Sequence, residues 1–203
     1  MLDIFFNELI GAVIQLLIFT LIPFLWWLIT ARKKESFFKW IGIKRIISEK
    51  NPFITLLITI SAAAAYTLLT YLCINLISDK ITAAGSQFAG MGIAAVPAAL
   101  AYGYIRTGLA EEIVFRGFLL KRIKSKFGFA AGNLVQAIIF GLLHGLPFGL
   151  ATQNILVTIL LTILPGAFGW YQGWLNEKRC GESIVPSWLL HGTMNFIVAC
   201  LSL

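Results

Sequence analysis

Residues 127–176 have the sequence FGFAAGNLVQAIIFGLLHGLPFGLATQNILVTILLTILPGAFGWYQGWLN, a run of 50 residues without Asp, Glu, Lys or Arg. A membrane helix needs roughly 20 apolar residues to cross about 30 Å of hydrocarbon, so this run is long enough for two crossings. Its most turn-like part is Gly145-Leu146-Pro147-Phe148-Gly149. The run therefore predicts two membrane helices, at about 129–144 and 153–176, joined by a turn at 145–149.

The rest of the chain has the same apolar character. Of its 203 residues, 59% are hydrophobic and 12% are charged, whereas charged residues make up about a quarter of a typical soluble domain. Other long uncharged runs occupy residues 9–31, 51–78, 81–105 and 183–203. These features exclude a soluble enzyme, a nucleic-acid-binding protein and a disordered tail. They predict an all-α membrane bundle of about six transmembrane helices, the other four at about 9–29, 53–77, 88–120 and 184–203.

The formal net charge of +7 has a strongly uneven distribution. Of the 16 lysines and arginines, 13 follow the first, third and fifth predicted spans: Arg32, Lys33, Lys34, Lys39, Lys44, Arg45 and Lys50; Lys121, Arg122, Lys124 and Lys126; Lys178 and Arg179. Positive residues concentrate in cytoplasmic connections, so we expect these three connections in the cytoplasm and both termini outside. The basicity thus indicates a multi-pass protein of the cell membrane, with lipid as its surroundings and no nucleic-acid partner.

The third predicted span, 88–120, is longer than one membrane thickness at 1.5 Å per residue. It must therefore tilt, break or dip. Glycine weakens a helix interior, and membrane helices tolerate breaks where neighbouring helices satisfy the backbone. Gly103 and Gly108 are the expected break points.

Four charged residues lie within eleven positions of this span: Arg106, Glu111, Glu112 and Arg116. A charge inside a membrane span costs roughly 2.5–3.5 kcal/mol on insertion scales, so such residues are functional candidates. Glu112 and Arg116 are four apart and can form an ion pair on one helix face. Glu111 points about 100° away from Glu112 and lacks that partner, which makes it a candidate general base.

The chain has two histidines, and both lie in apolar surroundings. His191 is four residues before Asn195, so the two share one face of the last span. If the third and fourth spans form a hairpin around the basic turn at 121–128, Glu111 and His144 come to a similar depth.

In chain order, the polar residues form three motifs: EExxxR from Glu111 to Arg116, FxxxH from Phe140 to His144, and HxxxN from His191 to Asn195. They resemble the motifs of the CAAX protease and bacteriocin-processing (CPBP) family, also called the Abi family, which carries them on three membrane helices. The resemblance covers about residues 95–203. It suggests a division into an N-terminal pair of spans with a basic cytoplasmic loop, 1–90, and a catalytic membrane domain, 91–203.

The resemblance implies a glutamate-type intramembrane endopeptidase, similar to the type II CAAX prenyl endopeptidase, that hydrolyses a peptide bond in a membrane-associated or lipidated peptide or protein. By motif position, the implied roles are a general-base pair, Glu111 and His144, an oxyanion-stabilising pair, His191 and Asn195, and a supporting pair, Glu112 and Arg116. No metal is expected in the site, and the cavity is expected to open toward the cytoplasm.

Two alternatives remain open at this point. A glutamate and two histidines could bind zinc and leave an open position for water, as catalytic zinc sites do, although the HExxH spacing is absent. The chain could also be a non-catalytic bacteriocin-immunity or binding protein, or a proton-coupled carrier that uses Glu and His as a relay. A carrier would be expected to show repeated halves, and the sequence has no such repeat.

Overall fold

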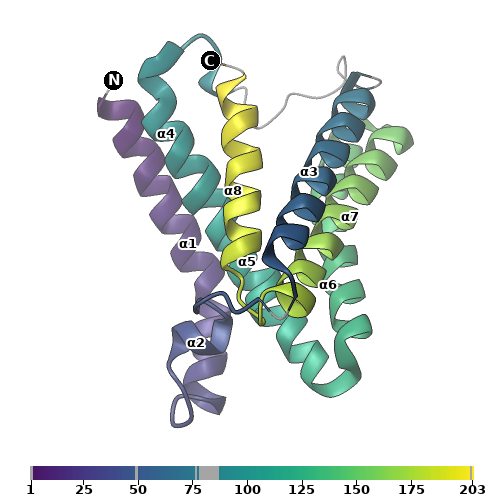
Figure 1. Ribbon diagram of the computed structural model, residues 1–203. Helices are drawn as coiled ribbons and strands as arrows, with labels where there is room; N and C mark the ends of the chain where they lie inside the picture. The colour runs from purple at the N-terminus through teal and green to yellow at the C-terminus, as the bar shows by residue number, and fades with distance from the viewer. Residues whose placement is uncertain (1, 49, 76, 78–86, 202) are drawn as a thin grey trace. The chain divides into compact units, whose positions relative to one another are not determined.

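The computed structural model describes residues 2–48, 50–75, 77, 87–201 and 203, and all regular structure among them is helical (Figure 1). Four of the described helical stretches are long and apolar enough to cross a membrane: Asp3–Thr30, Pro52–Cys73, Gly92–Thr152 and Ile155–Arg179. The last helix, α8 (Val185–Cys200), has 16 residues and is about 24 Å long. The predicted fold class, an all-α membrane bundle, is confirmed.

The chain folds into two compact units, each built from separate segments. Unit 1 comprises Met1–Ile46, Ala83–Phe118 and Ser183–Leu203, and unit 2 comprises Ile47–Thr82 and Leu119–Glu182. Each unit consists of segments that pack against one another. The division into 1–90 and 91–203 follows from the family resemblance, and it stays a prediction.

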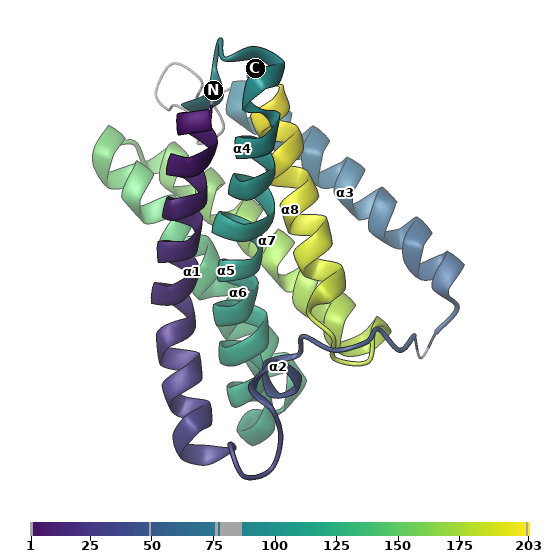
Figure 2. The same ribbon diagram turned by 90° about the vertical axis from the view of Figure 1, so that its left-hand side faces the viewer.

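Three helical segments form the body of unit 1. They are α1 (Leu2–Thr30), α8, and a continuous run made of η2 (Gly92–Ala95), α4 (Val96–Leu100), η3 (Ala101–Leu109), α5 (Ala110–Glu112) and η4 (Ile113–Leu120). Both α1 and α8 pack against η3, and the three lie side by side in Figures 1 and 2.

Two apolar clusters bracket the middle of this run. One contains Phe88 and Tyr102, and the other joins Ile113 to Ile41 of the short helix α2 (Phe37–Ile41). The polar residues of η3 and α5 lie between Tyr102 and Ile113. The polar segment between Tyr102 and Ile113 is thus packed into an apolar cluster at each end.

The expected break at Gly103 or Gly108 is wrong. The backbone stays helical there, with wide π-type turns through η3 and η4. Both glycines serve close packing against α8: a Cβ on Gly103 would lie 2.8 Å from the carbonyl oxygen of Gly192, and one on Gly108 would lie 3.3 Å from the Gly192 Cα. Wide turns of this kind occur frequently at functional sites.

Unit 2 consists of α3 (Pro52–Asn75), α6 (Lys121–Thr152) and α7 (Ile155–Arg179). Helix α6 turns sharply at Gly128, whose φ of 83° and ψ of 168° suit glycine. This turn lies inside the basic stretch 121–128, where the sequence predicts the hairpin. After it, α6 packs along α7, and α3 packs against α7.

The turn predicted at 145–149 is wrong, because α6 continues through it to Thr152. The chain turns instead at Gln153, which has a φ of 51°, and Asn154, whose side chain accepts the backbone N–H of Leu156 at 2.9 Å. Glycines 141, 145 and 149, four residues apart, face α7: a Cβ on Gly145 would lie 1.9 Å from Thr162 Oγ1. Small residues at this spacing allow membrane helices to approach closely.

Candidate active site

The two adjacent glutamates of α5 differ in their surroundings. Glu112 is fully buried and forms an ion pair with the equally buried Arg116, Oε1 to Nη1, at 3.1 Å. This is the i,i+4 pair that the sequence predicts. The Glu111 side chain keeps 15% of its surface exposed. Of the two carboxylates, Glu111 is therefore the more exposed, although its Oε2 atom is buried and has no hydrogen-bond partner among the described residues.

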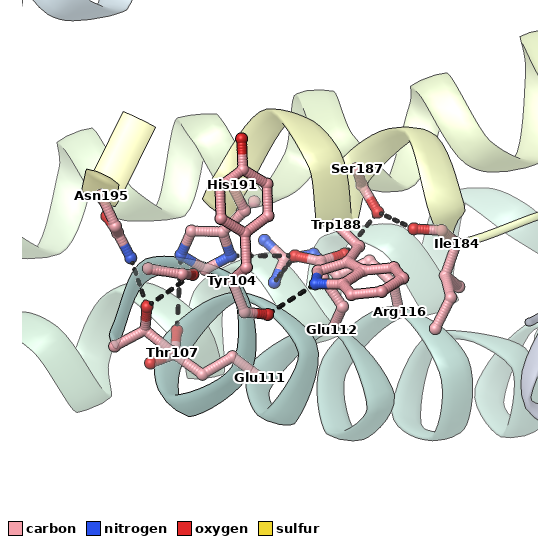
Figure 3. A network of polar contacts seen from close by, with 12 residues as sticks. Tyr104, Thr107, Glu111, Glu112, Arg116, Ile184, Ser187, Trp188, His191 and Asn195 are labelled. Carbon is pink, nitrogen blue, oxygen red and sulfur yellow. Dashed lines mark hydrogen bonds and ion pairs between the residues drawn. The ribbon is translucent and has the colours of Figure 1, made fainter. Parts of the chain in front are cut away.

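Helix α8 completes the surroundings of Glu112 (Figure 3). The Ser187 hydroxyl donates to Glu112 Oε2 at 2.5 Å, and His191 Nδ1 lies 3.1 Å from Glu112 Oε1. A buried carboxylate is costly unless several groups bond its oxygens, and charge-assisted hydrogen bonds of this kind offset that cost together with the ion pair. Ser187, His191 and Arg116 thus converge on one buried anion.

His191 lies between the two glutamates. Its Nδ1 contacts Glu112, and its Nε2 lies 3.7 Å from Glu111 Oε2. An ionised carboxylate only accepts hydrogen bonds, so Nδ1 must carry a proton in the contact with Glu112. The buried glutamate therefore fixes the ring orientation and directs Nε2 toward Glu111.

Asn195 lies one helical turn after His191 and is held by η3. Its Nδ2 donates to Thr107 Oγ1 at 2.8 Å, and the Thr107 hydroxyl lies 3.0 Å from the carbonyl oxygen of Tyr102 and 3.1 Å from that of Gly103. Because the hydroxyl proton is directed to these backbone carbonyls, the oxygen accepts from Asn195. This contact determines which end of the amide faces Thr107.

Further contacts set the spacing of η3 and α8. Trp188 Nε1 donates to the carbonyl oxygen of Tyr104 at 2.6 Å, and the Tyr104 hydroxyl lies 2.7 Å from Thr193 Oγ1. A Cβ on Gly192 would lie 2.5 Å from the Tyr104 ring, so glycine is needed there. The close approach of the two helices is what brings His191 within reach of both glutamates.

His144 belongs to unit 2, on the part of α6 that follows Gly128. Its Nδ1 lies 2.8 Å from the carbonyl oxygen of Phe140, and the two rings are 4.5 Å apart between centroids. A carbonyl oxygen cannot donate, so Nδ1 carries the proton and Nε2 keeps its lone pair in the neutral ring. The pairing of His144 with Glu111 stays a prediction.

The comparison with protein families identifies the family of the chain. A family model described as Type II CAAX prenyl endopeptidase Rce1-like matches residues 93–197, more than half of the 203 residues, and includes all three motifs. The chain belongs to this family. The resemblance drawn from the motifs is thereby confirmed. No curated protein and no solved structure matches the chain.

The glutamates and histidines of this Rce1-like chain are also candidate metal ligands. The described residues contain no group of three or more His, Cys, Asp or Glu side chains placed to hold an ion. Within unit 1, the two potential metal-binding atoms that lie close together are Glu111 Oε2 and His191 Nε2. Catalytic zinc uses three protein ligands, so this pair alone does not make the site.

A second polar cluster in the Rce1-like chain was not foreseen from the sequence. Arg106 Nη1 donates to both carboxylate oxygens of Glu8, at 3.2 and 3.0 Å, and Gln15 Nε2 donates to the Arg106 carbonyl oxygen at 2.9 Å. Gly11, between these two α1 residues, lies against the guanidinium. The signal was present in the sequence, because positions 8, 11 and 15 share one face of an otherwise apolar helix.

Proposed function

We propose that this protein is a metal-independent intramembrane endopeptidase that hydrolyses a peptide bond in a membrane-associated or lipidated peptide or protein. Its family supports this activity, and prenylated peptides that end in a CAAX sequence are the first substrates to test. The observation that carries the proposal is the contact series from Glu112 to His191 to Glu111, in which a fully buried carboxylate directs an imidazole toward a second, more exposed carboxylate.

In the proposed reaction, Glu111 and His144 together take a proton from water. Glu111 is the more exposed carboxylate, its Oε2 has no hydrogen-bond partner among the described residues, and the backbone contact of His144 leaves its Nε2 lone pair for the proton. The resulting hydroxide attacks the carbonyl carbon of the scissile bond. The same pair then returns the proton to the leaving nitrogen as the C–N bond breaks.

His191 and Asn195 stabilise the oxyanion that forms during this attack. Asn195 Nδ2 carries two hydrogens, of which one bonds Thr107, so the other is available to a substrate oxygen. A doubly protonated His191 would donate from Nδ1 to Glu112 and from Nε2 to the oxyanion. Glu112, which contacts Nδ1, carries the charge opposite to that of an imidazolium. Preorganised donors of this kind typically contribute about 100- to 1,000-fold to the rate.

Glu112 and Arg116 act as the supporting pair. Their ion pair is buried within unit 1, and Glu112 in turn holds Ser187 and His191 of α8. The pair therefore orients a catalytic side chain without reaching the substrate.

The basic connections support an orientation for the site. The stretches at 31–50, 121–126 and 178–179 hold most of the cations of the chain. By the positive-inside rule they face the cytoplasm, so we propose that the site opens toward the cytoplasm and sideways to lipid.

The test is cleavage of farnesylated and unmodified peptides by detergent-purified protein, with wild type beside Glu111→Gln, His144→Ala and His191→Ala, each with and without a zinc chelator. Cleavage that survives the chelator and is abolished in the three variants supports the proposal. Loss in the chelator that added zinc restores would assign these residues to a metal site. A phenotype in cells that persists in Glu111→Gln, without cleavage in any condition, would favour a binding or immunity protein.

A further inference from the structure

A groove runs between α3 and α7 in unit 2, outside the proposed active site. Its larger part has a volume of about 820 Å³ and is lined by apolar and aromatic side chains, among them Ile54, Leu57, Trp170 and Trp174. Small-molecule sites in proteins are commonly mostly apolar cavities of roughly 300–1,000 Å³. The groove is therefore of the size and character that a ligand can occupy.

The groove continues along the two helices. A second hollow of about 200 Å³ shares Ala62 and Tyr171 with the first and reaches Leu164. From Trp174 to Leu164 the groove follows ten residues of α7, which is about 15 Å. That length is half of the roughly 30 Å hydrocarbon core, so the groove matches the chains of one leaflet.

Cations lie at the Trp174 end of this groove. The Arg179 guanidinium stacks over the Trp174 ring at 5.0 Å, and the Lys178 ammonium lies 4.5 Å from the Phe129 ring. Within the part of the chain that the structure describes, neither cation forms an ion pair. Glu177, the acidic residue next to them in the sequence, pairs instead with Lys121 and Lys124.

We propose that this groove binds one anionic phospholipid of the leaflet on the basic side of the protein. Its acyl chain lies between α3 and α7, and its phosphate contacts Arg179, with Lys178 adding to the positive field. The assignment follows from an apolar groove one leaflet long that ends at unneutralised cations beside aromatic rings. Basic sites between membrane helices on the cytoplasmic side are a recognised way to bind anionic headgroups.

The experiment uses the full-length protein in nanodiscs of phosphatidylcholine that contain a small fraction of lipid with brominated acyl chains. The brominated lipid is either phosphatidylglycerol or phosphatidylcholine, and bromine quenches tryptophan fluorescence at contact. The groove signal is the part of the quenching that disappears in a Trp170→Phe/Trp174→Phe variant. We expect brominated phosphatidylglycerol to give the larger groove signal. Equal signals from the two lipids would overturn the proposal.

Two matched pairs of variants separate the chain site from the headgroup site. Ala62→Phe fills the groove and is expected to remove the preference for phosphatidylglycerol, whereas Ala64→Phe, on an exposed part of the same helix, keeps it. Arg179→Gln is expected to weaken the preference about fivefold, the effect of one basic residue at an anionic surface. Lys126→Gln removes the same charge from an exposed position and should leave the preference unchanged.

Each pair has an outcome that contradicts the proposal. An unchanged preference in Ala62→Phe would show that the lipid chain does not occupy the groove. Equal losses in Arg179→Gln and Lys126→Gln would show attraction by the overall charge of the protein instead of a site at Arg179.

Discussion

The side-chain amide of Asn195 donates to the hydroxyl oxygen of Thr107 across 2.8 Å, and the Thr107 hydroxyl is itself directed to the backbone of η3. An amide has two chemically different ends, so its orientation has to be fixed if one N–H is to meet a developing oxyanion. Thr107 fixes it by offering an acceptor. We infer that Thr107 positions Asn195 for the proposed reaction.

Thr107→Val should lower kcat with little change in KM, because valine has nearly the shape of threonine but offers no acceptor to Asn195. A displacement of about 1 Å in a catalytic group can cost about 100-fold in rate, which sets the upper limit of the effect. Thr107→Ser keeps the hydroxyl and should stay close to wild type. The measurement is steady-state cleavage of the best substrate from the peptide panel.

A double variant tests whether Thr107 acts through Asn195. If it does, Thr107→Val adds nothing to Asn195→Ala, because the group that it positions is already gone. Additive losses in the double variant would contradict this role. An active Asn195→Ala variant would instead contradict the oxyanion assignment itself, so the two failures can be told apart.

Arg116→Ala should lower the yield of folded protein. It leaves the fully buried Glu112 without its arginine, and breaking a buried pair from one side typically costs about 3–5 kcal/mol. Glu112→Gln/Arg116→Met removes both charges and should recover much of the yield. The readouts are size-exclusion profiles and thermal unfolding in detergent. Normal yield together with full activity in Arg116→Ala would show that the ion pair does not support the site.

The spans were predictable from the sequence because the bilayer imposes length and apolarity on every crossing. The turn between the fourth and fifth spans was not, because Gly145 and Gly149 suit a turn as well as they suit close helix packing. The spacing of Gly141, Gly145 and Gly149 distinguishes the two uses, since four-residue steps place all three on one helix face. The same ambiguity produced the wrong break points at Gly103 and Gly108.

Gly141→Ala should therefore destabilise the protein, although alanine is the better helix former. Its Cβ would lie 2.3 Å from the carbonyl oxygen of Thr162, a backbone atom that cannot rotate away. Overpacking of this kind costs about 1–3 kcal/mol. Gly11→Ala is the control, because its Cβ meets the Arg106 side chain at an ordinary 3.7 Å. Thermal unfolding in detergent compares the two variants, and equal stability would rule out the packing role.

Cys180 offers a test of burial at the end of α7. The thiol is buried, and burial raises the pKa of Cys180 above its ordinary value, with Arg179 opposing in part. A raised pKa means that the reactive thiolate forms at higher pH. In a variant with Cys73→Ser and Cys200→Ser, the pH midpoint of maleimide labelling should lie higher in the folded protein than in the same chain unfolded in detergent. Identical midpoints would show that the thiol is not desolvated.

The polar residues of the site were also predictable only in part. Glu112 and Arg116 were predictable because an i,i+4 pair depends only on helix geometry, and the shared face of His191 and Asn195 because polar residues in an apolar helix must face a partner. Which residue that face meets depends on the π-type turns of η3 and η4, which change the angular positions along the helix. The contact of Thr107 with Asn195 and that of Glu8 with Arg106 therefore required the structure.

The ion pair of Glu8 and Arg106 predicts an asymmetry between its two single variants. The Arg106 side chain is 35% exposed, whereas that of Glu8 is 8% exposed. Removal of Arg106 leaves a buried carboxylate, while removal of the Glu8 charge leaves a guanidinium that can reach polar surroundings. Arg106→Leu should thus lower the thermal midpoint clearly, by at most the equivalent of about 3 kcal/mol, and Glu8→Gln should lower it less.

In Glu8→Gln/Arg106→Leu the buried charge is gone, so the midpoint should rise above that of Arg106→Leu alone. A larger loss in Glu8→Gln than in Arg106→Leu would mean that the unpaired arginine is more costly than the unpaired glutamate. Glu8 would then not be the more buried member of the pair.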